Sequence, residues 1–209
     1  MSVDVLNEKA RLEKFYDDNL SALKSLGSAI SNNILPMCLR EFKYIEISFR
    51  VKEQKKAVQK IERKYTDNVF RGEKFEVFFP DLIGIRVVCL YEDEVRQIVD
   101  KIKDVFDCVE EHFSDKYMLN DEEPERFGYR AIHCVGRLGV ERRRLGEYKE
   151  FPDVLFEIQV RTIIQDAWAN LAHKAYHAPP PSAVRRKIAV VAAILELADR
   201  EFLAIRDNA

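Results

Sequence analysis

The chain has 209 residues, of which 47% are hydrophobic and 33% are charged, and its formal net charge is −2. This length suits one domain or one domain with helical extensions, and the hydrophobic fraction is ordinary for a globular protein with a core. The small net charge excludes a generic polyanion binder, so any grip on a nucleotide must come from local clusters of charge.

The cysteines and the N-terminus point to a reducing compartment. Cys38, Cys89, Cys108 and Cys134 show no CxxC spacing, which predicts buried free thiols. The N-terminal segment is too charged for a signal peptide, and no apolar run approaches the ~18 residues that would span a bilayer. We therefore expect a soluble, cytoplasmic protein.

The first half of the chain predicts two helical segments around one strand. Apolar residues at helical spacing predict helix over about 4–40, with breaks at Gly27-Ser28 and at Pro36. Strict alternation predicts a strand over 43–52, and a basic helix carrying Lys60 follows over 53–65. The segment 66–79 is expected to be irregular.

The second half alternates strands and helices. Strands are predicted over 82–91, 105–113, 129–138 and 153–161, with an amphipathic helix over 93–105 and a polar loop over 114–127. Two helices follow, over 162–177 and 183–206. In the first of these, Ile164, Trp168, Leu171 and Ala172 are predicted to face the core. The result is an α/β (α+β) fold with a mixed five-stranded sheet flanked by helices.

Two predicted strands carry polar residues on one face. Glu157, Gln159 and Arg161 alternate with apolar residues, so a carboxylate, an amide and a guanidinium share a strand face. Arg50 and Lys52 are spaced in the same way, which suits a polyphosphate and a planar base, although a solvated strand face gives the same pattern.

Two further segments add candidates. Asp81 begins a strand in which Arg86 interrupts an apolar run, which a buried strand tolerates only if the arginine is paired or lies at a site. Tyr129 beside Gly128 is a candidate platform for base stacking, or else a half-buried core aromatic. His133, on the same face, suits a hydrogen-bonded structural role or a catalytic base.

The common alternatives lack their motifs. The sequence has no HExxH and no paired Cys/His spacing for zinc, no GxxxxGK or GxGxxG phosphate loop, and no nucleophile elbow of a serine hydrolase. Asp81 and Glu157 come from different strands, as a Mg²⁺ site that bridges triphosphate oxygens requires. Cations around them suit phosphoryl transfer between two nucleotides, where positioning and charge neutralisation supply most of the rate.

The order and spacing of these segments resemble the synthetase domain of the RelA/SpoT family over about residues 40–180. The matching segments are Arg50-Val51-Lys52, Asp81 to Arg86, Gly128 to His133, Glu157 to Thr162, Ala167-Trp168 and His173-Lys174. The resemblance implies a nucleotidyltransferase-like fold in a small alarmone synthetase, without the further domains of the long enzymes. It implies transfer of pyrophosphate from ATP to the 3′-hydroxyl of GDP or GTP with Mg²⁺, giving (p)ppGpp in the stringent response.

The same resemblance implies a role for each matching residue. Arg50 and Arg86 would sandwich the adenine, and Lys52 and Lys60 would hold ATP phosphates. Asp81 and Glu157 would bind Mg²⁺, and Glu157 would act with Gln159 on the attacking hydroxyl. The residues assigned to the acceptor are Tyr129, Arg130, His133, Arg161 and Lys174.

The sequence departs from the family pattern beside the acceptor, at Phe127, and after Lys52, where Glu53, Gln54 and Lys55 replace the usual serine region. Phe127 and the arginines at 142–144 leave open a toxin-type relative that modifies adenosine nucleotides or the 3′ end of tRNA. A catalytically silent nucleotide-binding module is the third alternative.

The expected organisation is an N-terminal helical extension (1–40), a synthetase domain (41–180) and a C-terminal helix (181–209). The last helix has apolar positions on more than one face. We therefore expect it to pack partly against another subunit in a homo-oligomer, although an ordinary core helix gives the same pattern.

Overall fold

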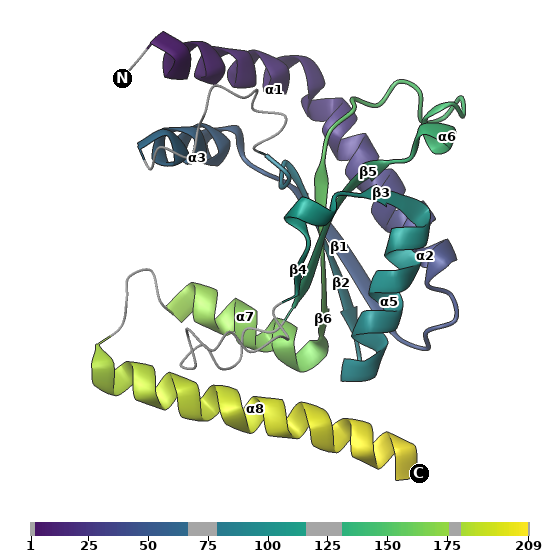
Figure 1. Cartoon of the computed structure of the whole chain (residues 1–209), viewed down its shortest axis with the longest axis vertical. Helices are drawn as coiled ribbons and strands as arrows, with labels where there is room; N and C mark the ends of the chain where they lie inside the picture. The colour runs from purple at the N-terminus through teal and green to yellow at the C-terminus, as the bar shows by residue number, and fades with distance from the viewer. Residues whose placement is uncertain (1–2, 67–78, 116–130, 176–180, 209) are drawn as a thin grey trace.

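The structure is a computed structural model, and it describes residues 3–66, 79–115, 131–175 and 181–208. A mixed sheet lies at its centre. Helix α3 (Gln54–Thr66) and the start of α1 (Val3–Ala29) lie at one end of the sheet, and α7 (Ile163–Ala175) and α8 (Ser182–Asn208) lie at the other (Figure 1). No described helix combines the length and apolar character that crossing a membrane requires.

The sheet has six strands in the order β1-β2-β6-β5-β3, with β4 paired to β5. The strands are β1 (Ile45–Val51), β2 (Ile83–Cys89), β3 (Phe106–Cys108), β4 (Ser114–Asp115), β5 (Ile132–Leu138) and β6 (Phe156–Thr162). The pair β2–β6 is parallel, and the other pairs are antiparallel. The mixed α+β sheet is as expected, but the prediction of five strands was wrong.

The additional strand arises where the predicted third strand is broken. After β3, the chain turns through a short 3₁₀ helix, Glu110–His112, in which the amide of Phe113 donates to the carbonyl of Glu110 at 3.0 Å. This turn lets Ser114 and Asp115 pair with β5 at a new position, within the segment predicted to be a loop. The predicted single strand over 105–113 was therefore wrong in its second half.

The N-terminal helix does not break at Gly27. Helix α1 spans Val3–Ala29 and continues through a π-helical turn, Ile30–Ile34, into α2 (Leu35–Cys38), where Pro36 lies in the first turn. A Cβ on Gly27 would lie 2.5 Å from the ring of Phe49. Gly27 thus lets α1 approach β1 closely, and the local preference of glycine for a break is overridden by this packing.

The two faces of the sheet differ, as the strand alternation predicts. One face is apolar and packs against α1 and α5 (Glu92–Val105) in a continuous core. Buried members of this core include Leu12, Ile85, Ile98, Phe156 and Ile158. The opposite face carries the polar side chains and has α3 (Gln54–Thr66) at one end and α7 (Ile163–Ala175) at the other.

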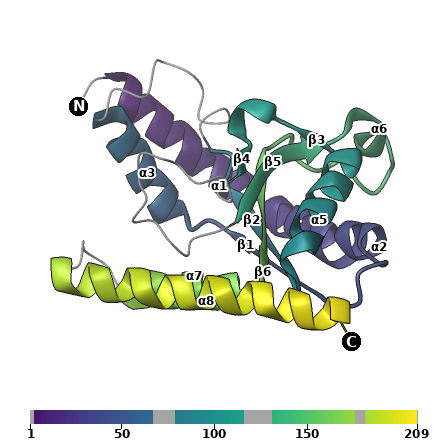
Figure 2. The same cartoon turned by 60° about the horizontal axis from the view of Figure 1, so that its bottom comes forward.

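Helix α8 (Ser182–Asn208) runs alongside α7 in both views (Figures 1 and 2). Trp168 of α7 is buried between them, as predicted, but Leu171 is 63% exposed, so its predicted place in the core was wrong. The reason is that α7 turns only one side to the sheet and to α8, and Leu171 lies on another side.

All four cysteines are free thiols. Cys89 and Cys134 are buried, and burial raises the pKa of both, that of Cys134 to about 12. They therefore stay protonated and unreactive at neutral pH. Cys38 and Cys108 are half-buried, so the prediction of burial was wrong for these two.

Candidate functional site

A cleft of about 210 Å³ lies on the polar face of β1, β2 and β6. Strand register brings its side chains into two rows. Arg50, Gly84 and Glu157 are opposite one another in the first row, and Ser48, Arg86 and Gln159 in the second. Side chains opposite one another on adjacent strands share a face of the sheet, and all six of these residues line the cleft together with Asp81.

Gly84 leaves the middle of this cleft open. It lies between Arg50 and Glu157 in the first row, and a Cβ there would lie 3.7 Å from Nε of Arg50. A side chain larger than alanine would therefore fill the space between the arginine and the carboxylate.

Two lysines hold Asp81 at one end of the cleft. Lys52, just after β1, and Lys60 of α3 each donate to one of its carboxylate oxygens, and the contact from Lys60 is 2.8 Å long. Tyr16 of α1 donates to the carbonyl of Lys52 at 2.8 Å and so fixes the backbone that carries this lysine.

Burial disfavours the charged forms of Asp81 and Lys52, and the neighbouring charges reverse this effect only for Asp81. Burial raises the pKa of Asp81, but hydrogen bonds and charges from Lys52 and Lys60 outweigh it, so the net shift is downward. Burial lowers the pKa of Lys52, and one carboxylate shared with a second lysine only partly offsets this. The cluster has two cations for one anion, so it is well suited to receive further negative charge.

A directed chain of hydrogen bonds runs along β6. Arg161 donates to Oε1 of Gln159, and Nε2 of Gln159 donates to Oε2 of Glu157 at 2.7 Å. Nδ1 of His133 lies 3.0 Å from Oε1 of Glu157. An arginine can only donate and an ionised carboxylate can only accept, so the orientation of the Gln159 amide and the proton on Nδ1 of His133 are both determined.

This chain keeps Glu157 ionised. Burial raises its pKa, but the hydrogen bond and charge of His133 and the hydrogen bond of Gln159 outweigh burial, and the net shift is downward. The negative charge of Asp81 acts in the opposite direction and raises the pKa of Glu157. The two carboxylates are therefore close enough to repel each other, which is the situation that a divalent cation relieves.

Asp166 of α7 holds two arginines of the sheet. It lies 3.2 Å from Arg86 and 3.7 Å from Arg161. Arg86 was predicted either to be paired or to lie at a site, and the structure gives it both a partner and a place in the cleft. Asp166 was not predicted as this partner, although an arginine inside an apolar strand signals that a carboxylate must lie nearby.

The other predicted residues divide into two groups. His133 and Arg161 are buried and reach the cleft through their hydrogen bonds to Glu157 and Gln159. Tyr129 and Arg130 lie outside the described residues, and Lys174 lies in α7 where side chains are not described. The acceptor side of the predicted site is thus described only in part.

The arginines between β5 and β6 contact groups of their own connection. Arg143 pairs with Asp153 at 2.7 Å and Arg144 with Glu141 at 2.8 Å. Arg142 lies over the ring of Tyr148, 6.0 Å from its centroid. These contacts partly neutralise the positive charge on which the alternative of a tRNA acceptor was based.

A family model described as a region found in RelA / SpoT proteins matches residues 49–179. The GTP pyrophosphokinase YwaC of Bacillus subtilis (strain 168) is 28% identical over 160 residues, which cover 75% of this chain and 71% of that protein.

Solved structures of small alarmone synthetases share the fold. Small alarmone synthetase 2 from B. subtilis is 26% identical, with a TM-score of 0.65 and coverage of 93% of this chain and 96% of that one. Small alarmone synthetase 1 from B. subtilis, bound to its product pppGpp, is 22% identical, with a TM-score of 0.66 and coverage of 95% and 98%. The same synthetase bound to AMPCPP gives 18% identity, a TM-score of 0.58 and coverage of 95% and 97%.

Proposed function

Because the chain belongs to the RelA/SpoT family, we propose that it transfers pyrophosphate from ATP to the 3′-hydroxyl of GDP or GTP. The products would be AMP and the alarmone (p)ppGpp. The observation that carries the proposal is the cleft in which Asp81 and Glu157 lie with Arg50 and Arg86. Similarity to YwaC, a GTP pyrophosphokinase, supports it, as does the likeness to a synthetase that has been solved with pppGpp and with AMPCPP.

On this proposal ATP occupies the β1–β2 side of the cleft. Arg50 is exposed and Arg86 is partly exposed on adjacent strands, and both line the cleft, so their guanidinium planes can stack on the two faces of adenine. Lys52 and Lys60 would hold the phosphates. Both already point at one carboxylate, so phosphate oxygens can take over their hydrogen bonds at little cost in reorganisation.

The carboxylates suit Mg²⁺. Asp81, which lies in the turn before β2 and does not begin the strand as predicted, and Glu157 of β6 offer hard oxygen donors. Their mutual repulsion falls when a cation lies between them. Within the described ranges no three His, Cys, Asp or Glu side chains form a ready-made metal cluster. This fits an ion that is held by two carboxylates and by the phosphates of the nucleotide, the usual mode for Mg²⁺. When bound, the ion would neutralise charge on the transferred phosphates.

Glu157 would also act on the acceptor. Its lowered pKa keeps it ionised at neutral pH, so it can accept the proton of the 3′-hydroxyl as the oxygen attacks the β-phosphorus of ATP and AMP leaves. Gln159 and His133 hold this carboxylate from two sides, and Arg161 orients Gln159. Tyr129 would stack on the acceptor guanine, with Arg130 and Lys174 near its phosphates.

The test is a product assay with purified protein, ATP, Mg²⁺ and GDP or GTP. The expected products are AMP and a 3′-pyrophosphorylated guanosine nucleotide. Labelled ATP offered with adenosine nucleotides or bulk tRNA separates the toxin-type alternative, which predicts label on those acceptors and none on GDP. Failure to release AMP with any acceptor would overturn the proposed activity and favour the silent module.

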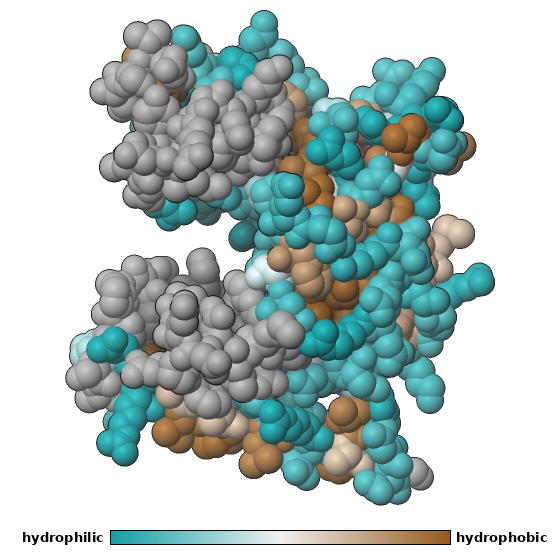
Figure 3. Space-filling model, in the orientation of Figure 1, coloured by the Kyte–Doolittle hydropathy of each residue, from teal (hydrophilic) through white to brown (hydrophobic). Residues whose placement is uncertain are grey.

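The same proposal includes a homo-oligomer formed through α8. This helix exposes Val190, Ile194, Leu197, Phe202 and Ile205. Hydrophobic residues gather along its outer side in the space-filling view (Figure 3). An exposed apolar surface of this kind marks an interaction site. Sedimentation equilibrium should give a mass above that of the 24.4 kDa chain, and a monomer at all concentrations would overturn this part. On this view residues 1–40, 41–180 and 181–209 are the helical extension, the synthetase domain and the contact helix.

A further inference from the structure

Asp199 occupies an unexpected place in α8. The side of this helix that faces the rest of the molecule carries Ile188, Ala192, Leu195 and Leu203 at helical spacing, and Asp199 falls within the same stripe. It is 3% exposed. A carboxylate is costly at such a position unless it is hydrogen-bonded, so its partners indicate why it is there.

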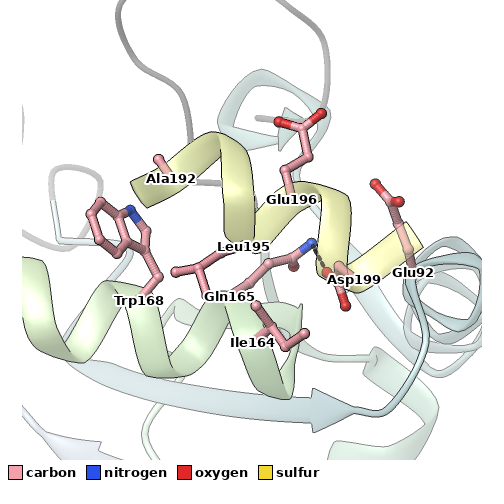
Figure 4. A pocket seen from close by; sticks show the side chains of 8 residues that line it. All are labelled: Glu92, Ile164, Gln165, Trp168, Ala192, Leu195, Glu196 and Asp199. Atoms are coloured by element: carbon pink, nitrogen blue, oxygen red, sulfur yellow. Dashed lines mark hydrogen bonds between the residues drawn. The ribbon is translucent and has the colours of Figure 1, made fainter. Parts of the chain in front are cut away.

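Asp199 accepts hydrogen bonds from two residues at the junction of β6 and α7. Thr162 ends β6 and precedes the helix, and its amide donates to the side chain of Gln165 at 2.9 Å, while the amide of Gln165 donates to the Thr162 hydroxyl at 3.2 Å. This reciprocal pair is a capping box. Oδ2 of Asp199 accepts from both members, at 2.7 Å from the Thr162 hydroxyl and at 3.1 Å from Nε2 of the Gln165 side chain. Figure 4 shows the contact with Gln165.

The capped turn leads directly into the cleft. Asp166 follows Gln165 and contacts Arg86 and Arg161 at 3.2 and 3.7 Å. Thr162 also ends the strand that carries Glu157 and Gln159. The negative charge of Asp199 near the first turn of α7 is favourable for the helix dipole as well. A continuous path of hydrogen bonds, one peptide link and ion pairs therefore joins α8 to the nucleotide cleft.

We infer that Asp199 is a positioning residue, which fixes the first turn of α7 and through Asp166 sets the place of Arg86 for ATP. The inference rests on the proposed function for the identity of the nucleotide. It assigns to α8 a role in substrate binding in addition to any contact with another subunit. Helix α8 has a second contact that serves for comparison: Arg206, about two turns beyond Asp199 and near the C-terminal end of the helix, pairs with Asp93 of α5 at 2.9 and 3.0 Å.

The experiment compares Asp199→Ala, Asp199→Asn and the control Arg206→Met. Binding of a non-hydrolysable ATP analogue is measured by calorimetry. Asp199→Ala should weaken it about tenfold, within the range by which residues of one network couple. Asp199→Asn keeps an oxygen that can accept from both donors and should stay within about threefold of wild type. Arg206→Met removes the ion pair between α8 and Asp93 of α5 and leaves the start of α7 as it is. The affinity of this variant for the ATP analogue should equal that of wild type.

Two readouts separate positioning from loss of structure. Amide exchange in a peptide that covers the start of α7 should accelerate in Asp199→Ala and not in Arg206→Met. Trp168 is the single tryptophan and lies against Ala192 and Leu195 of α8, so its emission reports whether α8 remains docked. A red shift of this emission in Asp199→Ala would mean that α8 has moved away from α7. In that case Gln165→Met, which removes the same hydrogen bond from the α7 side, is measured instead, and the same loss of affinity for the ATP analogue is expected.

The outcomes are distinct. Equal affinity in wild type and Asp199→Ala, or an equal loss in Arg206→Met, would overturn the positioning role and leave the proposed function intact. Wild-type protein that binds no ATP analogue would overturn the proposed function and the nucleotide part of this inference together. The exchange measurement needs no nucleotide, so it decides the link between Asp199 and α7 in either case.

Discussion

Replacing Glu157 with glutamine tests the centre of the proposed site with little change of shape. In the wild type, the carboxylate accepts from Gln159 at 2.7 Å and from His133 at 3.0 Å. Arg161 fixes the orientation of the Gln159 amide, so the new Oε1 can accept the same bond. The new amide nitrogen then faces Nδ1 of His133, which can accept once the imidazole proton moves to Nε2.

The magnitudes separate folding from activity. A hydrogen bond to a charged group contributes about 1 kcal/mol more than a neutral one, so two such bonds predict a loss of about 1–2 kcal/mol in the free energy of unfolding. Removing a general base lowers the rate by about 10²–10⁴-fold, which corresponds to about 3–5 kcal/mol in the barrier. The protein should therefore remain folded while turnover is nearly lost.

The assay measures AMP release with ATP and GDP, affinity for the ATP analogue and urea unfolding in the same preparations. Glu150→Gln is the matched control, because the Glu150 side chain is 83% exposed and outside the cleft. We expect Glu157→Gln to bind the ATP analogue but not to turn over. A kcat within about threefold of wild type would refute the role of Glu157 as base. A loss of unfolding free energy well above 2 kcal/mol would refute the hydrogen-bond chain as described.

Three further perturbations test the lysine cluster, its pH dependence and the packing of α1. Lys52→Met removes one of the two cations on Asp81 and should weaken binding of the ATP analogue by about 10–100-fold, the worth of a charged hydrogen bond. Asp81→Asn should lower the free energy of unfolding at pH 7. The pKa of Asp81 is lowered in the folded protein, so its carboxylate stabilises the fold fully above the ordinary pKa of about 3.9 and loses this effect as the pH falls through the folded pKa. The difference between wild type and Asp81→Asn should therefore shrink at low pH. Gly27→Ala should lower the unfolding free energy by about 1–2 kcal/mol, because its Cβ would lie 2.5 Å from the Phe49 ring.

Each of these has its own control and contrary result. Lys56 is 66% exposed, so Lys56→Met should bind the ATP analogue normally, and an equal loss there would mean that only net charge matters. A pH-independent difference between wild type and Asp81→Asn in urea unfolding would contradict the lowered pKa. Ser25 is exposed two residues from Gly27, so Ser25→Ala should be neutral, and a Gly27→Ala protein as stable as this control would contradict the close approach.

Local alternation was enough to predict the strands of the site and the face that each side chain occupies. Strand β6 is an example: Phe156, Ile158 and Val160 are buried, while Glu157 and Gln159 face the cleft, because successive side chains of a strand always point to opposite sides. The ordered motifs around Arg50, Asp81 and Glu157 also predicted the family. These features depend on neighbouring residues, so the sequence alone determines them.

The tertiary structure decided which of these residues meet. Arg86 and Asp166 are 80 positions apart, and Thr162 and Asp199 are 37 apart. Strand order, register and helix docking bring such pairs together, and no local periodicity encodes them. The same holds for Gly27, whose conformational preference predicted a break but whose contact with Phe49 requires a continuous helix. The sequence thus determined the residues and faces of the site, and packing over long sequence separations decided how they are held.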